Sequence, residues 1–182
     1  MVILATAIAA IVQLRHLRSA NEIASFTRLL QDWESRDMVE AWDFVQNEIP
    51  RLLDDPSFRH ELDRRLPPTS ERARLAKACY RRVGNFFEYM GWMVEMRFLD
   101  RENVMRYWAA HILAVWKDFE PLIGIFRRSD TGVFDRFEYL CALANEWSKK
   151  HPEGTFPKGV QRVDIVDKYR EADRLFASTL RD

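Results

Sequence analysis

Two glutamates, Glu88 and Glu95, are the side chains whose type and setting most suggest acid-base chemistry. They lie in the run NFFEYMGWMVE, and a helix would place both at one edge of its apolar face. Seven residues correspond to two helical turns, about 10 Å along the axis. Carboxylates at that separation neither share a proton nor bind one metal ion. We therefore expect no paired-carboxylate chemistry from this helix alone.

A histidine on the next predicted helix offers Glu88 another way to take part in catalysis. If the chain turns near Asp100, the following helix runs back antiparallel and places His111 opposite Glu88. A carboxylate can orient an imidazole that acts as a general base, so the pair is a candidate catalytic site. The same pair can be a satisfied polar contact at the edge of a core, and we favour this structural interpretation.

Two glycines share the stripe that carries Glu88. Gly84 and Gly91 lie four residues before it and three residues after it, on the same side of a helix. Because glycine has no side chain, such a stripe lets another helix come close. We expect these glycines to mark close helix packing.

Other catalytic and cofactor motifs are missing from the sequence. The four histidines are scattered, no Glu-x-x-His pair occurs, and Cys79 and Cys141 lie inside apolar helical patterns. This argues against zinc and di-iron sites and favours buried thiols. The glycines form neither a phosphate-binding loop nor a dinucleotide fingerprint. We expect no metal, no cofactor and no enzymatic activity.

One stretch is strongly basic, although the whole chain balances 28 basic against 28 acidic residues. Residues 59–82 hold eight arginines and lysines against three acidic residues, a net charge of plus five. Such a stretch can contact anionic lipid headgroups or nucleic acid. We favour the alternative that it is a solvated surface neutralised by a neighbouring acidic helix. The basic residues are Arg59, Arg64, Arg65, Arg72, Arg74, Lys77, Arg81 and Arg82.

The elements that must position these residues are helices. Apolar residues recur every three or four positions, and no segment alternates as a half-buried strand does. The pattern predicts an all-α antiparallel bundle. Proline, glycine and capping residues set the expected helix limits. We expect the first helix to end near residue 31, the second to extend from 38 to before Pro50, and a short third helix over 56–66. A long helix should follow from the Ser70 cap to Leu99, and the next should run from the Asp100 cap to a kink or an end at Pro121. A further helix should follow Asp130, and the last should cover 163–180.

The first helix begins with an apolar segment. Residues 2–14 carry no charge, and Arg15, His16 and Arg18 follow at once, as in a membrane segment with a basic cytoplasmic flank. The segment measures about 20 Å, against about 30 Å for a hydrocarbon core. We expect a transmembrane helix with a truncated start, which contacts the lipid bilayer through residues 2–14 and leaves residues 15–182 in the cytoplasm. A buried soluble helix and a signal peptide are the alternatives.

The predicted organisation has three parts, with the double proline Pro67-Pro68 as the main internal boundary. Residues 1–31 form a membrane anchor and its helical extension. Residues 32–66 form an acidic second helix and a short amphipathic helix. Residues 67–182 form a helical core domain.

The chain resembles a bacterial family known as domain of unknown function 4760. The resemblance covers about residues 1–150, and the apolar start is shorter here than in the family. It implies a membrane-anchored helical protein with no assigned activity, and it carries over no catalytic residue. The runs that carry the resemblance are Ile11-Val12-Gln13-Leu14-Arg15, Asn85-Phe86-Phe87-Glu88, Tyr107-Trp108 and Pro121-Leu122-Ile123.

The function that these features predict is a membrane-anchored cytoplasmic domain for protein-protein interaction or self-assembly. Two alternatives stay open. The first is binding of anionic lipid or nucleic acid through residues 59–82. The second is an enzyme that uses Glu88 and His111.

Overall fold

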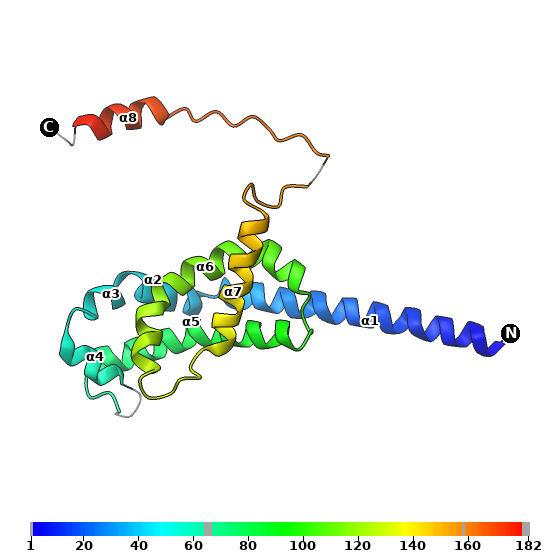
Figure 1. Cartoon of the computed structure of the whole chain (residues 1–182), viewed down its shortest axis with the longest axis horizontal. Coiled ribbons are helices and arrows are strands. Elements are labelled where there is room, and N and C mark those ends of the chain that lie inside the picture. Colours follow the sequence, from blue (N-terminus) through cyan, green and yellow to red (C-terminus); the bar gives the residue numbers. More distant parts are fainter. Residues whose placement is uncertain (1, 64–66, 158, 180–182) are drawn as a thin grey trace. The chain divides into compact units, whose positions relative to one another are not determined.

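The computed structural model describes residues 2–63, 67–157 and 159–179 (Figure 1). Within these ranges it contains eight α-helices and no β-strand, so the all-α fold class is confirmed. The chain divides into two compact units, Met1–Pro152 and Glu153–Asp182. The helices are α1 Val2–Trp33, α2 Arg36–Asn47, α3 Ile49–Leu52, α4 Pro56–Leu62, α5 Glu71–Glu95, α6 Arg101–Phe126, α7 Asp135–Lys150 and α8 Arg170–Thr179.

Capping side chains explain where four of the helices begin. Each N-cap side chain accepts a hydrogen bond from a backbone N–H of the first helical turn, which otherwise lacks a partner. The caps expected at the starts of α5 and α6 are therefore confirmed. The four N-cap residues are Ser35 of α2, Asp55 of α4, Ser70 of α5 and Asp100 of α6.

Glu61 of α4 holds the cap of α5 and makes it sensitive to pH. Ser70 donates to the Glu61 carboxylate from its backbone N–H at 2.9 Å and from its hydroxyl at 2.7 Å. These hydrogen bonds, the backbone one first, lower the pKa of the Glu61 carboxyl below its ordinary value of 4.5. A carboxyl with a lowered folded-state pKa contributes stability above its unfolded pKa, and this stability is lost as the pH falls through the folded pKa.

Substitution of Glu61 by glutamine is therefore expected to act mainly near neutral pH. The melting temperature of Glu61→Gln should be lower than that of the wild type at pH values above 4.5. The difference should shrink as the pH falls below that value, because the wild-type carboxyl then also becomes neutral. Thermal unfolding followed by circular dichroism at a series of pH values measures both. A difference that does not depend on pH would contradict this role of Glu61.

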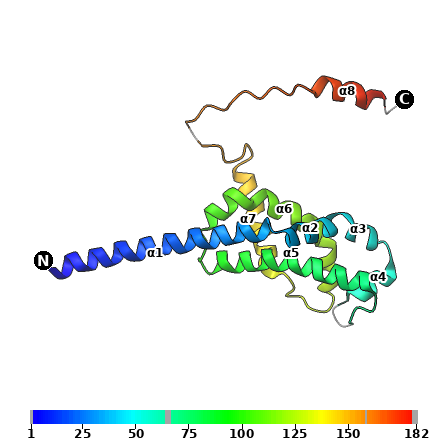
Figure 2. The ribbon, with the colours of Figure 1, turned by 180° about the vertical axis from the view of Figure 1, so that it is seen from behind.

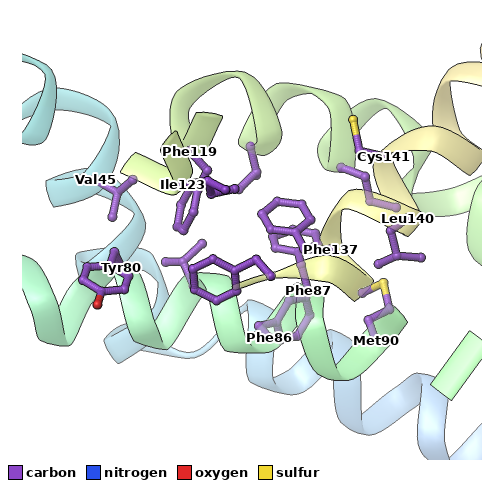
Figure 3. Close-up of a cluster of buried hydrophobic side chains, with 14 of the residues drawn as sticks. Val45, Tyr80, Phe86, Phe87, Met90, Phe119, Ile123, Phe137, Leu140 and Cys141 are labelled. Atoms are coloured by element: carbon purple, nitrogen blue, oxygen red, sulfur yellow. The ribbon is translucent and has the colours of Figure 1, made fainter. Parts of the chain in front are cut away.

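Helix α7 packs against both α5 and α6 and closes the core of the first unit (Figures 1 and 2). Phe137 of α7 is fully buried, stacks on Phe87 with ring centroids 4.7 Å apart, and meets the edge of Trp116 at 5.1 Å. Figure 3 shows Phe87 and Phe137 together in this core, with Leu140 nearby. Buried aromatic side chains of this size supply much of the free energy that holds a core together.

The two cysteines belong to the same core. Cys79 and Cys141 are buried and free, as the apolar patterns around them predict. Burial raises the pKa of both thiols. Because the thiolate is the reactive form, these cysteines are poor nucleophiles, and their role is packing.

The double proline lies inside the first unit. Helices α2 and α4, which precede it, both pack against α5, which follows it. One core therefore holds residues from both sides of the predicted boundary between 32–66 and 67–182. The first compact unit ends at Pro152. Residues 64–66 of the short amphipathic segment lie outside the described residues.

Helix α6 does not end at Pro121, as the sequence allowed, but continues to Phe126. Proline inside a helix removes one hydrogen bond and strains the preceding turn. Here the residues that follow it are anchored, because Leu122, Ile123 and Phe126 are buried in the core. Packing of the last turn thus outweighs the local cost of the proline.

The second unit, taken by itself, contains α8 and a preceding segment without regular structure. The helix expected over 163–180 begins at Arg170, later than the periodicity predicts. The β-branched residues Val163, Ile165 and Val166 explain the late start, because they lose side-chain freedom in a helix. Their side chains are exposed.

Helix α1 runs unbroken to Trp33, close to its predicted end. No helix among the described residues combines the length and the apolar character needed to cross a membrane. The expected transmembrane helix is therefore not supported. The physical reason is the short apolar segment of about 20 Å, which Arg15 and Arg18 follow within the same helix.

Candidate functional site

Glu88 caps the start of α7 from the neighbouring helix α5. Its Oε2 accepts hydrogen bonds from the backbone N–H groups of Arg136 at 3.1 Å and Phe137 at 3.0 Å. N–H groups in the first turn of a helix have no acceptor within that helix. Phe134, the residue at the N-cap position of α7, supplies no side-chain acceptor. The Glu88 carboxylate takes that place, and its charge lies at the positive end of the α7 dipole.

Arg136 connects Glu88 with Glu95. The Arg136 Nε lies 3.1 Å from Glu95 Oε2, and its Nη1 lies 3.7 Å from Glu88 Oε1. Ion pairs of exposed side chains contribute little to stability. The two backbone hydrogen bonds to Glu88 are therefore the stronger part of the polar contact between α5 and α7. The two glutamates of the sequence run thus hold a helix in place.

Gly84 and Gly91 lie beneath the start of α7. A Cβ atom added to Gly91 would lie 2.3 Å from the carbonyl oxygen of Arg136, and one added to Gly84 would lie 2.5 Å from Cζ of Phe134. Real Cβ atoms do not come so close to other heavy atoms. The helix that comes close to the glycine stripe is therefore α7.

His111 does not form the expected pair with Glu88. Among the described residues no hydrogen bond or ion pair joins them, and Glu88 is engaged by α7. The exposed ring of His111 instead lies against Trp108 and Trp33, with centroids 5.6 and 6.5 Å away. A hairpin made of α5 and α6 alone would place His111 opposite Glu88. Because α7 packs on both of them, it supplies the partner of Glu88.

A cavity of about 370 Å³ lies beside Glu88. His111 is not part of its lining, so this cavity does not bring the two proposed catalytic residues together. Glu88 already accepts two backbone hydrogen bonds there, which leaves it poorly placed to take a proton from a substrate. The other lining residues are Tyr80, Arg81, Asn85, Asp130, Gly132, Val133 and Phe134.

The basic residues of the stretch that the structure describes do not form one surface. On α5 the basic residues lie at different angles around the helix, at about 100° per residue, and Lys77 is buried. Arg82 forms an ion pair with Asp32 of α1. Arg74 donates to the carbonyl oxygen of Thr69 at 3.1 Å.

The other described basic residues, Arg59, Arg72 and Arg81, are also dispersed. Arg59 of α4 donates to the carbonyl oxygen of Leu53, whereas Arg72 and Arg81 are exposed on α5. Arg64 and Arg65, which belong to the predicted patch, lie outside the described residues. The predicted anion-binding patch is therefore divided between contacts within the chain and separate exposed side chains.

Comparison with known proteins places this fold in a family. A family model described as a domain of unknown function, DUF4760, matches residues 1–147. The chain belongs to the DUF4760 family. The match covers most of the first unit and ends within α7, so the DUF4760 domain and the helical bundle coincide. No curated protein and no solved structure matches the chain.

In this DUF4760 domain the N-terminal part of α1 projects beyond the bundle (Figure 2). Contact with the hairpin of α5 and α6 begins near Glu22, whose Oε1 accepts from Asp100 N at 3.0 Å and from Asn103 Nδ2 at 3.3 Å. Residues 10–21 are exposed, including Ile11 at 53% and Leu14 at 66%. The apolar segment therefore leaves the bundle at the end where α5 turns into α6.

That turn is a Schellman motif with an unusual residue. Phe98 N–H donates to Met93 O at 2.9 Å, and Arg97 N–H donates to Val94 O at 3.1 Å, which is the hydrogen-bond pattern of this motif. Arg97 has a φ of 60°, the left-handed conformation that glycine usually supplies. An arginine there costs about 1 kcal/mol relative to glycine. The missing glycine explains why the sequence did not reveal the motif.

An exposed aromatic surface surrounds this turn. Trp92 is half-buried, and its ring stacks on that of Tyr89 and lies tilted against that of Phe98. The ring centroids are 5.6 and 5.4 Å away. Met96 and Phe98 are 54% and 55% exposed, and Tyr89 is similarly exposed. We call Tyr89, Trp92, Met96 and Phe98 the tip patch. Large apolar side chains gathered on a surface mark a contact with lipid or protein.

Proposed function

We propose that this DUF4760 protein is a membrane-anchored helical interaction domain, held on the bilayer by residues 2–14 of α1. The observation that carries the proposal is the exposure of apolar side chains on the projecting part of α1, with Ile11 and Leu14 both more than half exposed. Such surface is unfavourable in water. Burial in lipid removes it from water without any change in the bundle.

The charge pattern favours lipid over a partner helix. Residues 2–14 contain no charged side chain, whereas helices that pair in water usually carry charges beside their apolar stripe. Arg15 and Arg18 follow directly, and each basic residue near an anionic membrane surface contributes about 1 kcal/mol of attraction. The same flank favours the cytoplasmic leaflet, with the bundle on that side.

The second unit supports the interaction part of the proposal. Val163, Ile165 and Tyr169 are exposed in a segment without regular structure. Apolar side chains in an extended segment can bind a protein partner by adding a strand or by ordering on its surface. An anchor at one end of the chain and a binding segment near the other would together recruit a protein to the membrane.

Arg72, at the basic end of α5, does not belong to the proposed membrane surface. Arg72 and Glu95 lie near opposite ends of α5, and 23 helical residues span about 35 Å. The end of α5 near Glu95 lies beside the base of the projecting helix, as the contact of Glu22 with Asp100 shows. A bilayer that receives residues 2–14 would thus lie far from Arg72.

Vesicle flotation of the full chain tests the proposal. We expect the wild type to float with vesicles of phosphatidylcholine and phosphatidylglycerol. The double variant Ile11→Lys/Leu14→Lys should bind at least tenfold more weakly, because a lysine at the centre of a membrane helix costs about 2.5–3.5 kcal/mol and a tenfold change needs only about 1.4 kcal/mol. The matched control Val39→Lys changes an exposed aliphatic residue of α2 and should float like the wild type.

Two results would count against membrane anchoring. Equal flotation of the double variant and the wild type would show that residues 2–14 do not hold the chain on lipid. A change of oligomeric state in the double variant, with unchanged flotation, would assign the segment to self-association. Size-exclusion chromatography with light scattering measures that state.

A further inference from the structure

We propose that the turn between α5 and α6 is a second membrane contact, in which Arg97, Met96 and Phe98, at the turn end of the tip patch, lie against anionic phospholipid headgroups beside α1. This inference rests on the proposed function, because it takes the position of the bilayer from residues 2–14. It adds a surface of the folded bundle to the anchor and names anionic lipid as its ligand.

The turn lies close to the level along α1 at which the bilayer would end. Asp100, the last residue of the turn, contacts Glu22 of α1 through the 3.0 Å hydrogen bond. Glu22 lies eight residues after Leu14, about 12 Å along the helix axis. The headgroup layer of one leaflet is about 5–8 Å thick. With Leu14 at the edge of the hydrocarbon, the turn lies just outside this layer, and extended side chains can reach it.

The turn contains residue types that are common at membrane interfaces. Tryptophan and tyrosine are enriched at membrane interfaces, where an apolar ring meets lipid and its polar atom meets water. At the turn, the exposed side chains of Met96 and Phe98 lie beside Trp92, whose ring contacts Phe98. Arginine can extend its stem over apolar surface and place its guanidinium at a phosphate. Arg97 lies between Met96 and Phe98 in the chain, so its position suits this task.

The acidic groups nearest to the turn are engaged within the chain. Glu22 accepts from the N–H of Asp100, and the Asp100 side chain accepts from the N–H of Asn103 at 2.9 Å. Glu102 pairs with Arg106 at 2.9 Å. The negative charges beside the turn therefore have local partners. Arg15 and Arg18 of α1 add positive charge on the side of the bilayer.

Arg97 has a left-handed backbone conformation that is unfavourable for a residue with a side chain. A residue with φ of 60° at the end of a helix is usually glycine, because a side chain there is strained. Strained residues persist where a function requires their side chain. A phosphate contact would account for an arginine at a position where glycine makes the more stable turn.

The test compares vesicle binding and stability of the full chain in three variants. Arg97→Gly should bind vesicles of phosphatidylcholine and phosphatidylglycerol about fivefold more weakly, the factor expected for one basic residue near an anionic surface. It should bind pure phosphatidylcholine vesicles like the wild type, and its melting temperature should rise. Met96→Ser/Phe98→Ser should bind both vesicle types more weakly. Leu75→Ser, an exposed aliphatic residue near the other end of α5, is the matched control.

If Arg97 contacts lipid, Arg97→Gly should be more stable than the wild type and should bind anionic vesicles more weakly. If Arg97 has only a structural role, its substitution should change the stability and leave vesicle binding unchanged. Unchanged binding of both tip variants, in an experiment where Ile11→Lys/Leu14→Lys fails to float, would overturn this inference and leave the anchor intact. Flotation of that α1 variant like the wild type would overturn the anchor and this inference together. A change of oligomeric state in the tip variants, with unchanged vesicle binding, would overturn it in favour of a contact between copies of the chain.

Discussion

Replacement of Gly91 by alanine is expected to lower the free energy of unfolding by about 3 kcal/mol. The new Cβ would meet the carbonyl oxygen of Arg136 at 2.3 Å and its carbonyl carbon at 2.8 Å. These are backbone atoms of α7, so no side-chain rotation relieves the clash. The start of α7 would have to move away from α5, which would disturb the buried ring of Phe137 and the hydrogen bonds to Glu88.

The other helical glycines provide graded controls for Gly91→Ala. A Cβ at Gly84 meets the ring end of Phe134, which can shift, so Gly84→Ala should cost less. A Cβ at Gly124 of α6 meets nothing within 4 Å, so Gly124→Ala should stabilise the protein by about 0.5–1 kcal/mol. Urea unfolding of the three variants measures the order. A cost below about 0.5 kcal/mol for Gly91→Ala would show that α7 does not pack tightly on α5.

Local features of the sequence were sufficient to predict most of the helices and part of the close-packing surface. The periodicity of α1 and the caps at Ser70 and Asp100 depend on neighbouring residues, so the sequence records them directly. The glycine stripe indicated that a helix comes close, but the sequence could not say which one. The pair of Glu88 with His111 followed from a hairpin that turns near Asp100 and runs back antiparallel, with no third helix between the two residues. The partner is α7, because a third helix packs against both arms of the hairpin.

The features that the sequence missed depend on tertiary structure or on an unusual residue. Arg97 occupies a position that pattern rules assign to glycine, so the turn carried no signal of its geometry. The basic stretch looked continuous because sequence places its residues side by side. In the fold, Arg82 pairs with Asp32 and Lys77 is buried, so charge density along the chain did not become charge density on a surface.

Substitution of Glu88 by alanine is expected to cost about 2 kcal/mol, because it leaves two N–H groups at the start of α7 without an acceptor and removes a charge from the positive end of that helix. Glu88→Gln keeps an acceptor oxygen but loses the charge, so it should cost about 1 kcal/mol. Urea unfolding measures both. Amide hydrogen exchange at Arg136 and Phe137 should be faster in Glu88→Ala than in the wild type.

Glu95→Gln is the matched control for Glu88, because both glutamates lie on α5 and both contact the Arg136 guanidinium. Among the described residues of α7, Glu95 contacts only the exposed side chain of Arg136. The substitution of Glu95 should therefore cost less than about 0.5 kcal/mol. Equal costs for Glu88→Ala and Glu95→Gln would show that the ion pairs, and not the backbone hydrogen bonds, hold α7. Two results together would establish that α5 supplies the cap that α7 lacks in its own sequence. Glu88→Ala would cost more stability than Glu95→Gln, and its amide exchange would be faster only at the start of α7.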